Sequence, residues 1–157
     1  MTRSLATASA ALFALIVAPT GATPAPVPPP YKADAKMVLA QLAGKWEQVT
    51  WTWSGIEERP PAGERRVLTF KKDGSWEATD GTVRGRLTRI NPTKNPEELD
   101  WERDGGDYIE TREMIFSLDA DTFRTCWSGW SGGRRPTEFT STKESLRVLT
   151  VFKRVKE

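Results

Sequence analysis

The segment GKWEQVTWTW, residues 44–53, decides the fold class of this chain. Val49, Trp51 and Trp53 occupy alternate positions in it, and polar residues lie between them. An alternation with a period of two is typical of a β-strand that buries one face and exposes the other. We therefore predict a half-buried strand over residues 45–54.

The rest of the chain repeats this pattern of short apolar runs separated by turn residues. It predicts seven further strands, over residues 65–70, 75–79, 82–90, 99–103, 108–118, 122–128 and 146–155. Short strands at regular spacing indicate a sandwich or a barrel, and closure removes the free edges of an antiparallel meander. We predict an all-β fold, an eight-stranded antiparallel up-and-down barrel. Apolar residues at three-and-four spacing predict one short helix before it, over residues 33–42.

The N-terminal region has the features of an export signal. Arg3 is the only charged residue among the first 31, and residues 5–18 are apolar or small. This run is shorter than the roughly 20 residues of a membrane span and is typical of a signal peptide. We expect cleavage after Ala22, export to the periplasm or the exterior, and no stable membrane anchor afterwards; an uncleaved anchor helix is the alternative.

Prolines dominate the next segment. Five of them between Pro24 and Pro30 predict an extended spacer over residues 23–32, because proline fixes φ and removes the backbone donor. The domain organisation that we expect is therefore a signal peptide over residues 1–22, this spacer, and a barrel domain over residues 33–157.

The composition argues against several kinds of chemistry. The chain has no His and one Cys, so it has no Ser-His-Asp triad, no Cys-His pair and no internal disulfide. It has 23 Lys and Arg against 21 Asp and Glu, interspersed along the chain, which argues against a concentrated basic face for nucleic acid. We expect a non-enzymatic protein with no cofactor, no metal site and no nucleic-acid partner.

Three stretches carry a resemblance. They are Gly44-Lys45-Trp46, residues 91–100 with their Asn-Pro-Thr-Lys-Asn-Pro sequence, and residues 118–154 with their Arg-Pro-Thr-Glu-Phe sequence. Together they resemble the small secreted lipocalin-like domain that is common in planctomycetes and has no assigned function. The resemblance implies a calycin-type barrel and no particular reaction. It also implies that Trp46 packs at the closed end of the barrel against a basic side chain of a late strand, for which Arg154 is the candidate.

Aromatic and aliphatic side chains on the predicted inward faces are the candidate lining of a ligand cavity: Val49, Trp51, Trp53, Phe70, Trp76, Leu87, Trp101, Phe123 and Trp127. Small-molecule pockets are mostly apolar, so such a cavity suits a small apolar or amphipathic ligand. Small eight-stranded barrels are also often filled by their own side chains. The alternative is therefore a structural or protein-interaction module with a solid core, which would bind through outer loops such as the one at Trp130.

Two sets of polar residues have alternative interpretations. Arg135 and Glu138 either form a polar site at the barrel mouth, where the arginine grips a carboxylate, or pair with each other or with the backbone while Phe139 anchors the connection in the core. Asp100 and Glu102 share one strand face, which is usually solvated. A carboxylate-based hydrolase is a remote alternative for that pair.

Overall fold

The computed structural model describes residues 34–106, 108–130 and 132–156. The predicted signal peptide and spacer lie outside the described residues. No helix among the described residues is long and apolar enough to cross a membrane.

One helix precedes the sheet, as predicted. Helix α1 covers Ala35–Leu42 and buries Val38 and Leu42. Asp34 caps it, because its carboxylate accepts a hydrogen bond of 3.2 Å from the backbone N–H of Lys36. The helix therefore begins two residues later than the predicted range of 33–42.

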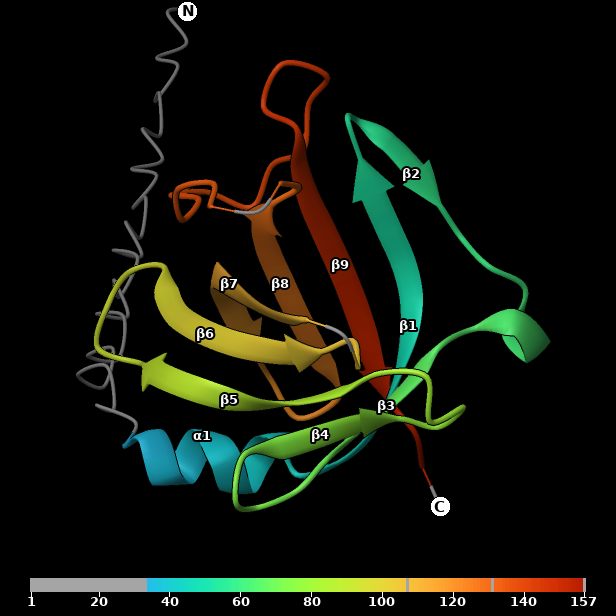
Figure 1. The fold of residues 1–157 in the computed structure, drawn as a ribbon, viewed down its shortest axis with the longest axis vertical. Helices are drawn as coiled ribbons and strands as arrows, with labels where there is room; N and C mark the ends of the chain where they lie inside the picture. Colours follow the sequence, from blue (N-terminus) through green and yellow to red (C-terminus); the bar gives the residue numbers. More distant parts are fainter. Residues whose placement is uncertain (1–33, 107, 131, 157) are drawn as a thin grey trace, which may run out of the picture. The chain divides into compact units, whose positions relative to one another are not determined.

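Nine antiparallel strands form one sheet, and eight of them close into a barrel (Figure 1). The strands are β1 Gly44–Trp53, β2 Ile56–Glu58, β3 Val67–Phe70, β4 Ser75–Ala78, β5 Arg84–Asn91, β6 Glu97–Asp104, β7 Ile109–Leu118, β8 Thr122–Ser128 and β9 Arg147–Arg154. Pairing of β1 with β9 joins the two ends of the meander. The predicted eight-stranded up-and-down barrel is confirmed.

The ninth strand was not predicted. Ser54 and Gly55 have φ angles of 50° and 78°, the left-handed pair that a two-residue hairpin turn requires. Strand β2 pairs with the end of β1 through this turn and lies outside the closed ring.

A bulge in β1 changes which side chains face the interior. The β1–β9 register shifts between Gln48 and Thr50, so Val49 has no partner residue on β9. Because a bulge inserts one residue, the faces before and after it exchange their odd and even positions. Trp46 and Gln48 therefore share the inner face with Trp51 and Trp53. The sequence pattern had placed Trp46 out of phase with that face.

Aromatic side chains fill the end of the barrel next to α1. Phe123, which is fully buried, has its ring centroid 5.9 Å from that of Trp46, 5.8 Å from Phe70 and 5.6 Å from Phe152. The indole Nε1 of Trp46 donates a hydrogen bond of 2.6 Å to the carbonyl of Leu42 at the end of α1. This end of the barrel is solid.

Candidate functional site

The other end of the barrel contains a cavity of about 650 Å³. Leu68 and Phe152 line it beside the packed aromatic end, and strands β1, β4, β6, β7, β8 and β9 contribute its walls. Exposed residues of the β2–β3 connection and the β4–β5 turn, such as Glu64 and Asp80, border it on the solvent side. The interior thus combines a solid half with a hollow half. A volume of this size lies within the range of ordinary small-molecule pockets.

Five of the nine predicted lining residues line this cavity: Trp51, Trp53, Trp76, Trp101 and Trp127. Phe70 and Phe123 belong to the packed aromatic end, and Leu87 packs against the core. Val49 lies at the bulge, and Gln48 lines the cavity from β1 in its place. The difference arises because the sequence showed which residues are apolar but not the bulge or the height of each residue along the barrel.

The tryptophans from different strands form a continuous aromatic wall. The rings of Trp76 and Trp101 are stacked, with centroids 4.7 Å apart and planes at 26°, and Trp127 follows with its centroid 6.5 Å from that of Trp101. Gly85 allows the stack, because it lies between their strands and a Cβ there would lie 2.7 Å from the Trp76 ring. Stacked rings of this kind offer flat apolar surface to a ligand.

Several residues that line this cavity each have one buried polar atom without a hydrogen-bond partner among the described residues. These atoms are the indole Nε1 atoms of Trp76 and Trp101, the Arg103 Nε and the Thr150 Oγ1. Buried polar groups in native proteins are nearly always satisfied, so these four atoms are exceptions in the cavity wall.

Arginines in the cavity were not among the predicted site residues. Arg112 lies with its Cζ 5.3 Å from the centroid of the Trp127 ring, and its Nη2 lies 2.9 Å from Oε2 of Glu110. Arg103 follows Trp101 by two positions on the same face of β6. The alternation of Leu99, Trp101 and Arg103 was the signal that could have revealed this inward cation.

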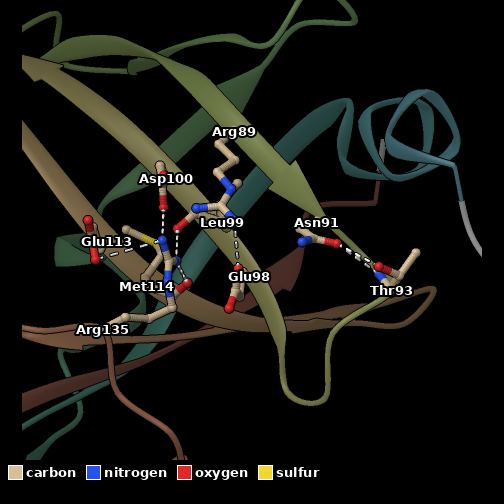
Figure 2. Close-up of polar contacts among 9 residues, drawn as sticks. All are labelled: Arg89, Asn91, Thr93, Glu98, Leu99, Asp100, Glu113, Met114 and Arg135. Carbon is tan, nitrogen blue, oxygen red and sulfur yellow. Dashed lines mark hydrogen bonds and ion pairs between the residues drawn. The ribbon is translucent and has the colours of Figure 1, made fainter.

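Arg135 is bound on the outer side of the barrel (Figure 2). Its Nη1 donates to the carbonyls of Leu99 and Met114 at 3.1 and 2.5 Å, and its Nη2 pairs with Asp100. Asp100 points outward because its neighbours on β6 are buried in the core. The arginine therefore fixes the β8–β9 connection, and its donors are engaged by the protein itself.

Arg135 and Glu138 do not pair with each other; Arg135 pairs with the backbone instead, which is the other form of the predicted structural role. Glu138 is 3.1 Å from Nη1 of Arg147. Phe139 is half-buried under the guanidinium of Arg124, whose Cζ lies 5.0 Å from the ring centroid, and it lies outside the core that it was predicted to anchor. The β8–β9 connection packs on the outer face of the barrel, which the apolar character of Phe139 alone did not reveal.

The Asp100–Glu102 pair does not line the main cavity. Asp100 is held by Arg135, and Glu102 lies opposite Arg86 in the β5–β6 register. Cys126 is also on the outer face, fully buried, with its Sγ 3.6 Å from the carbonyl of Thr140. Burial raises the pKa of the Cys126 thiol to about 11, so the thiol stays protonated and unreactive at neutral pH.

Comparison with protein-family models, curated proteins and solved structures finds no match for this chain.

Proposed function

We propose that this protein binds a small apolar or amphipathic molecule in the hollow half of its barrel. The observation that carries the proposal is the cavity of about 650 Å³ lined by five tryptophans. A closed barrel with one solid end gives a rigid pocket, which lowers the ordering cost of binding. The proposal is of a carrier or sensor rather than an enzyme, and it agrees with the resemblance to lipocalin-like domains.

The proposal includes export of the protein. The basic start and short apolar run of residues 1–22 support it. Expression of the full chain in a Gram-negative host, followed by N-terminal sequencing of the exported protein, tests it. A mature N-terminus at residue 23 is expected, and an exported protein that still begins at residue 1 would contradict cleavage.

Tryptophan emission tests binding directly, because five of the seven tryptophans line the cavity. Screening a library of small apolar and amphipathic compounds should give saturable changes in emission and a raised Tm for the ones that bind. Thr150→Phe places a ring in the cavity and should weaken the best compound at least about tenfold.

Val151→Phe is the matched control, because Val151 lies on the opposite face of the same strand. Binding should survive in this variant. If no compound changes the emission or the Tm of the wild-type protein, ligand binding in the barrel is wrong.

A second candidate function is a protein-interaction module. Trp130 in the β8–β9 connection is 63% exposed, and Ile109 at the start of β7 is 72% exposed. Large apolar side chains on loops can mark an interaction site. A purified partner whose binding is lost in Trp130→Ser, together with no ligand for the cavity, would favour this candidate.

A further inference from the structure

Arg103 is a half-buried cation of the cavity wall that makes no ion pair with any described residue. Arg112 pairs with Glu110 at 2.9 Å, and Arg65 pairs with Glu47 at the same distance. Arg66 is exposed at the border of the cavity, where its charge adds to the hydrogen bonds from Thr82 that lower the pKa of Asp80. By contrast, the Nε of Arg103 is buried without an acceptor among the described residues.

The fold directs Arg103 into the aromatic part of the cavity. It lies on the same face of β6 as Trp101, and directly opposite Gly85 on β5. Gly85 is also the residue opposite Trp76 on β4. Trp76, Gly85 and Arg103 therefore form one row across three strands, and the ring of Trp76 fills the space over Gly85.

Glu110 lies directly opposite Arg103 in the β6–β7 register, and its carboxylate already pairs with Arg112. The tryptophan neighbours of Arg103 add donors only. An indole N–H can only donate, and the Nε1 atoms of both Trp76 and Trp101 are buried without partners. Arg103 is half-buried on the cavity wall and makes no ion pair with a described residue, so its guanidinium N–H groups require an acceptor from a ligand in the cavity. The acceptor that best matches these groups is an anionic oxygen pair, since guanidinium binds carboxylate through two parallel hydrogen bonds.

We propose that the ligand is an organic acid, whose carboxylate is held by Arg103 while its apolar body lies against the tryptophan wall. This inference rests on the proposed function and specifies its ligand class. Binding of an organic acid differs from binding of a neutral apolar molecule in one measurable respect. The charged head group must contribute to affinity, and it must do so through Arg103.

The test compares two probes that differ only in the head group, phenylbutanoate and phenylbutanamide, by tryptophan emission and calorimetry at neutral pH. The wild-type protein should bind the carboxylate about tenfold more tightly than the amide, as expected for a hydrogen bond to a charged group. Arg103→Met should remove this preference and leave the affinity for the amide within about threefold. Arg103→Gln, which keeps a polar side chain, gives the same comparison if the Met variant does not fold.

Arg86→Met is the matched control, because it removes one positive charge from the outward face of the neighbouring strand. The preference for the carboxylate should survive in this variant. Equal binding of the two probes by the wild-type protein, or a preference that persists in the Arg103 variants, would overturn the organic-acid proposal while cavity binding stands. Binding of neither probe, with no binder in the wider library, would overturn the proposed function itself.

Discussion

The guanidinium of Arg154, near the end of the last strand, lies over the indole of Trp46 in the first strand, with its Cζ 4.2 Å from the ring centroid. The same guanidinium donates to the carbonyl of Ala120 at 2.8 Å and to that of Ala43 at 3.0 Å. Gly44 makes room for it, since a Cβ there would lie 3.1 Å from Nη1 of Arg154. One side chain thus links α1, β1, the β7–β8 turn and β9 at the point where the barrel closes.

Removal of this link should destabilise the whole barrel. We expect Arg154→Ala to lower the free energy of unfolding by about 2–3 kcal/mol, because it removes a cation–π contact and several charge-assisted hydrogen bonds. Arg154→Lys should lose most of the same stability, because an ammonium group lacks the planar set of N–H donors with which the guanidinium bonds several carbonyls at once. Urea unfolding measures both, with the exposed Lys156→Ala as the control. If Arg154→Ala lowers the free energy of unfolding by less than about 0.5 kcal/mol, Arg154 does not stabilise the closure of the barrel.

Gly85 should tolerate no side chain. A Cβ at this position would lie 1.8 Å from the carbonyl oxygen of Glu102 and 2.7 Å from the Trp76 ring. Gly85→Ala must therefore displace Trp76 or the β5–β6 pairing, and we expect a loss of at least about 2 kcal/mol together with a changed near-UV circular dichroism signal. Gly63→Ala is the control, because no atom lies within 4 Å of a Cβ there. Equal stability of the two variants would show that Trp76 does not depend on this glycine.

The sequence was sufficient to predict the eight strands of the barrel, because each strand is short, alternating and bounded by turn residues. It was not sufficient to predict which end is hollow. The strand sequences show which residues face inward but not where each residue lies along the barrel axis. Phe123 and Trp127 therefore looked equivalent, although Phe123 is in the packed end and Trp127 lines the cavity. The bulge at Val49 had no local signal, because valine suits any strand position.

The polar part of the site was missed for a different reason. Charged residues on strands are usually solvated, so Arg103 and Arg112 were not considered as inward residues. The phase of β9 was likewise open from sequence, and the structure resolves it: Val148, Thr150 and Phe152 are buried, whereas Leu149 and Val151 are only half-buried. A polar residue on the inner face, Thr150, is what made the pattern ambiguous.

Arg135 should matter for stability and not for binding. Arg135→Met leaves Asp100 without its cation and two backbone carbonyls without a donor, so we expect a loss of about 2–4 kcal/mol. The double variant with Asp100→Asn should recover part of this loss, because the unpaired carboxylate is then removed. The neighbouring, exposed Arg134→Met is the control and should change stability by less than about 0.5 kcal/mol. Any effect of Arg135→Met on cavity binding beyond that of its lower stability would contradict a purely structural role.

Four turn aspartates should give the barrel a dependence on acid pH. In Asp73, Asp80, Asp104 and Asp119, the carboxylate accepts the backbone N–H of the residue two positions later, and hydrogen bonding to the charged form lowers the pKa of each. The unfolded chain then binds protons at higher pH than the folded protein does. The stability due to these groups is therefore present above the usual aspartate pKa and is lost as the pH falls through the lowered values.

Replacement of all four by Asn keeps the acceptor oxygen but removes the titrating carboxylate. Urea unfolding at a series of pH values measures the effect. Between neutral and strongly acid pH, the free energy of unfolding of this variant should fall less steeply than that of the wild-type protein. An identical pH profile in the two proteins would show that these turns do not depend on the carboxylate charge.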